Sequence, residues 1–92
     1  MTSTTQIYSI RTKLRKHGIT TKQIPFLKVI AENDGITTLE IAQHFNITKQ
    51  AISKQAIPLE KKGIISNTHP HPLWKAWTIT DDTIRQLLTK HP

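Results

Sequence analysis

Basic and polar side chains recur on one face of residues 49–61. A helical wheel of this segment places Gln50, Ser53, Lys54, Ile57 and Lys61 opposite its apolar positions. Glutamine and serine can pair with base edges, lysine can reach guanine or phosphate, and an aliphatic side chain can touch the thymine methyl group. This face favours contact with the major groove of double-stranded DNA. The alternative is an ordinary solvated lysine surface.

Two further places could hold phosphate groups. Thr48 and Lys49 lie at the start of the same helical segment, where free backbone amides favour anions. Lys75 is the nearest permanent charge to the sequence His69-Pro70-His71. The candidate DNA-binding residues are therefore Thr48, Lys49, Gln50, Ser53, Lys54, Ile57, Lys61 and Lys75.

The sequence gives little evidence for a metal site, a cofactor site or a catalytic site. His69 and His71 supply at most two metal ligands, and the chain has no cysteine to complete a site. There is no glycine-rich phosphate loop and no nucleophile motif, while Asp81-Asp82 is typical of a helix start. We therefore expect no metal site, no cofactor and no enzymatic activity.

The size and net charge of the chain also favour a small domain that binds a polyanion. The chain has 92 residues, and its 13 lysines and arginines exceed its 6 acidic residues by 13 − 6 = 7. Such an excess favours a polyanionic partner. We expect one domain over residues 1–92, with an N-terminal helix in 1–18, a core in 19–80 and a C-terminal helix in 81–92. Apolar runs are too short for a membrane span, so a cytoplasmic protein is expected.

Glycine and proline divide the chain into elements. Gly18, Gly35 and Gly63 each follow a helical pattern, as glycines that end helices do. The expected helices cover 4–17, a segment from about Thr21 that carries six apolar residues, a short segment ending at Phe45, and 49–62. The second helix is expected at the centre of the core, or else shows an apolar face to a second subunit. In the first helix, Ile7, Ile10 and Leu14 form the packing stripe.

Residues 37–59 predict two helices joined by a tight turn. Thr37 and Glu40 have the spacing of a capping box, Asn46 tolerates the left-handed turn conformation, and Thr48 can cap the next helix. Leu39, Ala42 and Phe45 are expected to pack inward from the first helix, with Ile41 beside them. Ile52, Ala56 and Leu59 would anchor the second, in which Pro58 predicts a kink.

The remaining residues predict a hairpin and a last helix. Strands are expected at 64–68 and 74–79, with Trp77 and Ile79 facing the core and Trp74, Ala76 and Thr78 facing away. A helix from about Asp82 to Lys90 would then bury Ile84, Leu87 and Leu88. The expected fold class is mainly α with a small β-hairpin, in the order α-α-α-α-β-β-α.

This order resembles the winged helix-turn-helix transcription regulators of the MarR type. The matching residues are ITTKQIPFLKVIAENDGITTLEIAQHFNITKQAISKQAIPLEKKGIISN, followed by WTITDD. The segment IPLEKKGII is also similar to the ArsR type. Asn46 replaces the frequent turn glycine, Gln55 stands at a position that is more often apolar, and THPHPLWK replaces the usual acidic and arginine-bearing wing.

The resemblance implies a DNA-binding regulator, most commonly a repressor, and a homodimer formed through the N- and C-terminal helices. Two alternatives remain open at this point. An accessory factor in plasmid or phage replication or recombination would use the same surface. A protein-interaction module would use Trp74, Phe26 and Ile57 as anchors. The basic first helix could bind flanking phosphates or could simply be a solvated surface beside a dimer seam.

Overall fold

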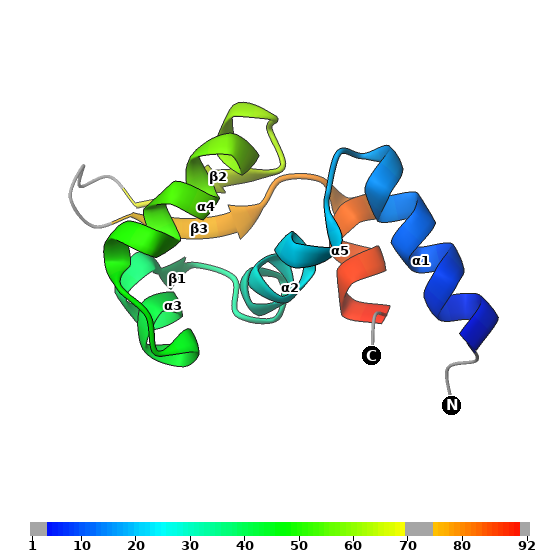
Figure 1. Ribbon diagram of the computed structural model, residues 1–92. Helices are drawn as coiled ribbons and strands as arrows, with labels where there is room; N and C mark the ends of the chain where they lie inside the picture. The colour runs from blue at the N-terminus through cyan, green and yellow to red at the C-terminus, as the bar shows by residue number, and fades with distance from the viewer. Residues whose placement is uncertain (1–3, 70–74, 91–92) are drawn as a thin grey trace.

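The computed structural model describes residues 4–69 and 75–90, with side chains from residue 9 onward. The described residues form five helices, a short 3-10 helix and a small sheet (Figure 1). None of the described helices is long and apolar enough to cross a membrane. The elements are α1 (Thr4–Lys16), η1 (Thr21–Gln23), α2 (Ile24–Glu32), β1 (Ile36–Thr37), α3 (Thr38–Phe45), α4 (Lys49–Lys61), β2 (Ile65–Asn67), β3 (Ala76–Ile79) and α5 (Asp82–Lys90).

The predicted winged helix-turn-helix order is confirmed, with one strand added. The sheet has the order β1-β3-β2, and both pairings are antiparallel. Ile36 lies opposite Trp77, and Ile65 lies opposite Ile79. The strand β1 was not predicted, because two residues are too short for a periodic pattern and because Thr37 was assigned as a helix cap. The third strand converts the hairpin into a sheet with β3 at its centre.

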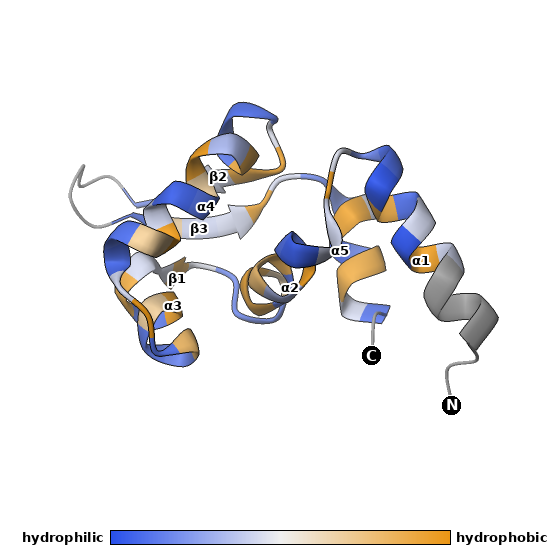
Figure 2. Cartoon of the chain, viewed as in Figure 1, coloured by the Kyte–Doolittle hydropathy of each residue, from blue (hydrophilic) through white to orange (hydrophobic). Residues whose placement is uncertain are grey.

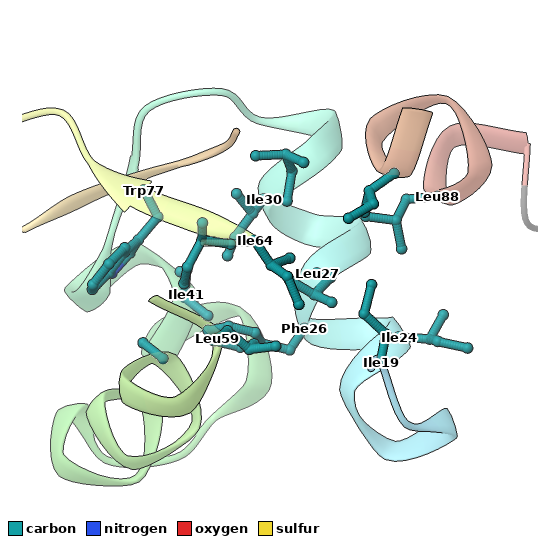
Figure 3. Close-up of a cluster of buried hydrophobic side chains, with 14 of the residues drawn as sticks. Ile19, Ile24, Phe26, Leu27, Ile30, Ile41, Leu59, Ile64, Trp77 and Leu88 are labelled. Carbon is teal, nitrogen blue, oxygen red and sulfur yellow. The ribbon is translucent and has the colours of Figure 1, made fainter. Parts of the chain in front are cut away.

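The second helix occupies the middle of the core, as predicted. It packs against α5 and β3, and its apolar side chains meet those of the surrounding elements (Figure 3). Five side chains around this short helix are buried. Its apolar positions therefore pack within the chain and do not form an exposed face for a second subunit. The five are Ile24, Phe26, Leu27, Val29 and Ile30.

The first and last helices pack against each other beside α2 (Figure 1). Leu14 is fully buried and Ile10 is buried at its edge, as the predicted stripe requires, whereas the side chain of Ile7 lies outside the described part. Ile84 and Leu88 are buried, but Leu87 is only half-buried. The two helices therefore meet along a seam that leaves Leu87 partly open.

One predicted orientation is wrong. Leu39 is 51% exposed, because the buried positions of α3 are Ile41 and Ala42, and Leu39 lies about half a turn from Ile41 around the helix. Ala76, which was expected to face away from the core, is 5% exposed but is not part of the core cluster that contains Trp77 and Ile79. Phe45 is half-buried, and Trp74 lies outside the described residues.

Arg85 links the last helix to the sheet. Its Nη2 donates to the carbonyl oxygen of Ile79 at 2.8 Å, to Thr78 Oγ1 at 3.1 Å and to Asp34 Oδ1 at 3.4 Å. The Thr78 hydroxyl also donates to Asp34 Oδ1. One guanidinium thus connects α5, the central strand and the loop that precedes β1.

Replacing Arg85 by Met tests this link. The variant keeps a long apolar side chain but removes the donors to three acceptors, so the free energy of unfolding should fall by about 1–2 kcal/mol. Urea unfolding measures the change. Arg15→Met, at an exposed position of α1, is the matched control and should stay within about 0.5 kcal/mol of the parent protein. Equal stabilities of the two variants would contradict the assigned role.

Candidate nucleic-acid interface

The helix-turn-helix begins with the predicted capping box. Thr37 Oγ1 accepts a hydrogen bond from the Glu40 amide at 3.2 Å, and the Thr37 amide donates to Glu40 Oε1 at 3.1 Å. These bonds satisfy two backbone donors that a helix start otherwise leaves unpaired. The start of α3 is therefore fixed within one residue.

The turn between α3 and α4 is equally defined. Asn46 adopts the left-handed conformation with φ 55° and ψ 46°, as its type predicts. The Ile47 amide then donates to the Ala42 carbonyl oxygen at 3.0 Å, which is the long bond of a Schellman motif. Ala42 itself is buried, so a small side chain stands where the helices pack. Together these features set the direction in which the chain enters α4.

The fourth helix starts at its predicted cap and is held on one side. Thr48 Oγ1 accepts from the Ala51 amide at 3.2 Å. Ile52, Ala56 and Leu59 are exposed by 0%, 1% and 0%, so the anchoring stripe is confirmed. The helix runs from Lys49 to Lys61 across Pro58.

The opposite side of α4 is open. Every predicted contact residue on it is exposed, and Ile57 shows 46% of its surface. Figure 2 shows hydrophilic residues along this helix between its apolar positions. The exposed residues are Thr48, Lys49, Gln50, Ser53, Lys54, Ile57 and Lys61. The structure thus brings seven of the eight predicted residues together on one helix and its cap.

This surface carries a net positive charge of modest size. The helix holds three lysines and Glu60, giving 3 − 1 = +2. Pro58 has no amide hydrogen, so the Lys54 carbonyl lacks the usual donor four residues on. Residues 49–54 contain no acidic side chain. The amino-terminal half of α4 therefore combines helix-start amides, two lysines and hydrogen-bonding side chains.

Lys75, the eighth residue, lies apart from α4, just before β3. Its side chain is half-buried, and its Nζ lies 5.6 Å from the centroid of the Trp77 ring, within the range of a cation–π contact. This contact between Lys75 and Trp77 was not predicted from the sequence. The available signal was the spacing of two residues, which places both side chains on the same face of an extended segment.

Trp77 also joins the wing to the helix-turn-helix. Its Nε1 donates to Thr38 Oγ1 at 3.0 Å, and the Thr38 amide donates to the Lys75 carbonyl oxygen at 3.1 Å. The ring is 2% exposed. The first residue of α3 is therefore hydrogen-bonded to the strand that leads out of the wing.

Asn67 closes the base of the wing. Its Oδ1 accepts from the Ala76 amide at 3.0 Å and from the His69 amide at 3.1 Å, the latter as an Asx turn. The Thr68 amide donates to the Ala76 carbonyl oxygen at 2.8 Å. The tip residues of the sequence prediction, His71, Leu73 and Trp74, lie outside the described residues.

Two other hypotheses concerned an anchor for a partner protein and a metal site. Phe26, named as an anchor for a partner protein, is 2% exposed and is therefore not available as one. Within residues 4–69 and 75–90, no three histidine, aspartate or glutamate side chains gather in a way that could hold a metal ion.

Comparison with known proteins agrees with this geometry. The family model for winged helix-turn-helix DNA-binding domains matches residues 27–66. MepR, a transcription regulator of the Staphylococcus aureus multidrug efflux pump MepA, is similar in structure, with a TM-score of 0.65 and 25% identity over 89% of this chain and 62% of that one.

Two further solved structures are similar. MepR in a complex with DNA matches with a TM-score of 0.66 and 22% identity over 94% of this chain and 65% of that one. The MarR protein from Peptoclostridium difficile matches with a TM-score of 0.69 and 22% identity over 88% and 54%. No curated protein sequence matches.

The chain spans less than two thirds of the matched chain in each of these three structures. Its fold is that of a winged helix-turn-helix domain with the architecture of MarR-type regulators, as the resemblance implied.

The bond between Trp77 and Thr38 can be tested by a matched pair of variants. Thr38→Val leaves the buried indole N–H without its acceptor, so the free energy of unfolding should fall by about 1–3 kcal/mol. Thr38→Ser keeps the hydroxyl and should lose much less. Urea unfolding followed by circular dichroism compares them. If the two variants were equally stable, the hydrogen bond would not hold the wing strand to α3.

Proposed function

We propose that this protein binds double-stranded DNA by placing α4 in the major groove, and that it acts as a transcription regulator. The observation that carries the proposal is the division of α4 into a buried stripe and an open face. Ile52 and Leu59 are fully buried, while Lys49, Gln50 and Lys54 are exposed. A helix held in this way can enter a groove without breaking its contacts with the core of the domain.

The side chains divide into two roles. Gln50, Ser53 and Lys54 have the donors and acceptors to pair with base edges, and exposed Ile57 can meet a thymine methyl group. Lys49 and the capped start of α4 suit phosphate oxygens, as do Lys61 and Lys75. Contacts of this kind set the register on the duplex without reading its sequence.

The similar structures support a regulatory outcome. MepR is a transcription regulator and has been solved with DNA, and this chain shares its fold. Repression by occupying a promoter is the simplest outcome for a compact DNA-binding domain. A homodimer through α1 and α5 would require inverted half-sites about 34–36 Å apart, whereas a monomer would need one short site.

Binding to DNA should depend steeply on salt. For each phosphate contacted, the slope of log K against log salt should be about −0.9. Fluorescence anisotropy with random duplex and with DNA from upstream of the protein's own gene measures this slope. A preference for the upstream DNA supports regulation, whereas equal binding to both supports an accessory role in replication or recombination. Binding that is absent or independent of salt would refute the proposal.

The two roles of the lysines predict different losses. Lys54→Ala should reduce the difference in binding free energy between preferred and random DNA by about 1–3 kcal/mol, because a base contact is lost. Lys49→Ala should weaken both DNAs alike and make the salt slope shallower by about 0.9. Lys22→Ala, exposed in η1, is the control and should change neither quantity. Identical effects of the first two variants would contradict the division of roles.

A further inference from the structure

The exposed face of α4 carries four side chains in one line along the helix. Gln50, Lys54, Ile57 and Lys61 follow one another at intervals of four, three and four residues. Because an α-helix has about 3.6 residues per turn, these intervals place them on one stripe, opposite buried Ile52. With a rise of about 1.5 Å per residue, Gln50 and Ile57 stand about 10 Å apart along the axis. Since neighbouring base pairs are about 3.4 Å apart, this separation corresponds to about three base-pair steps.

Gln50 is the residue of this stripe that can identify adenine. It is exposed in the first turn of α4, and the first residues of a recognition helix are those that contact base edges. No hydrogen bond from its side-chain amide to another residue is found in the described part of the chain. A free carboxamide can accept from N6 of adenine and donate to N7 at the same time, a pattern that distinguishes an A·T pair in the major groove. Gln50 therefore favours an A·T pair.

Ile57 presents an isolated aliphatic group on the same stripe. Its surface is 46% exposed. The residues next to it on the open side of the helix are Ser53, Lys54 and Lys61, so its apolar surface does not extend into a patch that could dock a protein. The methyl group of thymine is the apolar group that a base pair offers to such a side chain in the major groove. Ile57 therefore favours a second A·T pair.

The chain has no arginine in a position to select G·C pairs. Arginine bonded to O6 and N7 of guanine is the commonest specific contact with a base. The three arginines of the sequence lie on α1 and α5, whereas α4 and residues 64–80 contain none. Lys54, between Gln50 and Ile57, can still reach a guanine at a pair between the two A·T pairs. The chemistry at the two outer positions thus favours A·T, and G·C recognition is confined to the middle.

We propose that α4 recognises two A·T pairs about three base-pair steps apart in its target DNA. Gln50 identifies one of them by hydrogen bonds to adenine, and Ile57 identifies the other by contact with the methyl group of thymine. This inference rests on the function proposed for α4, because both side chains must lie in the major groove.

Selection from a pool of random duplexes tests the pattern. The full chain is mixed with the pool, and the bound DNA is amplified and sequenced over several rounds. The enriched sequences should share two A·T positions about three base-pair steps apart. Enrichment of a motif without these two positions would overturn the inference and leave the function proposed for α4 intact. If the chain bound no duplex and enriched no sequence, both proposals would fail.

Single methyl groups removed from the selected duplex test Ile57. Replacing thymine by uracil deletes one methyl group, so at the position read by Ile57 the parent protein should bind about fourfold more weakly. Ile57→Ala should bind the thymine and uracil duplexes equally. The control is Leu39→Ala, which removes an exposed hydrophobic side chain outside α4 and should keep the fourfold difference. Fluorescence anisotropy measures the affinities. A difference that persists in Ile57→Ala would overturn the inference.

Gln50 is tested in the same duplex with 7-deazaadenine, in which a carbon replaces the N7 acceptor. At the position read by Gln50, the parent protein should lose about fivefold in affinity, because one hydrogen bond is removed. Gln50→Ala should show no further loss on this replacement. Gln55→Ala, at an exposed position outside the stripe, is the matched control and should keep the fivefold loss. Circular dichroism confirms that all variants keep their helices. Equal sensitivity of the Gln50 and Gln55 variants to 7-deazaadenine would overturn the role assigned to Gln50.

Discussion

The burial of one stripe of α4 is the interaction on which the interface depends. Ile52, Ala56 and Leu59 remove that stripe from water, which stabilises the packed helix and fixes its rotation about its axis. Because the α-helix repeats every 3.6 residues, the same rotation determines that Gln50, Ser53 and Lys54 face outward. The open face is therefore a consequence of core packing, and a change in the core would reorient all contact residues together.

The rest of the fold positions elements around this helix. The Schellman turn at Asn46 sets the direction from α3 into α4, and the bond from Trp77 to Thr38 ties the wing strand to the start of α3. Arg85 in turn connects that strand to α5. A chain of hydrogen bonds and packed side chains thus runs from the last helix through the sheet to the helix-turn-helix. Displacing α5 would shift the wing relative to α4.

The excess of positive charge is distributed over two ends of the molecule. One part lies with hydrogen-bonding side chains on α4, where it suits groove recognition. The other part lies between α1 and α5, where three lysines share a cleft with no carboxylate in its lining. Keeping such charges apart reduces their mutual repulsion in the folded state.

The sequence by itself determined the features that arise from local physics. The caps at Thr37 and Thr48, the left-handed turn at Asn46 and the buried stripe of α4 follow from side-chain chemistry and helical periodicity within a few residues. Seven of the eight candidate contacts are exposed on or beside α4 for the same reason.

Tertiary structure alone decided what depends on distant partners. The strand Ile36–Thr37 forms because β3, some forty residues later, supplies its hydrogen bonds. The exposure of Leu39, the burial of Ala76, the contact of Lys75 with Trp77 and the basic cleft likewise depend on how separate elements pack. Local propensity contains no information about such neighbours, because their contacts form between segments that are far apart in the chain.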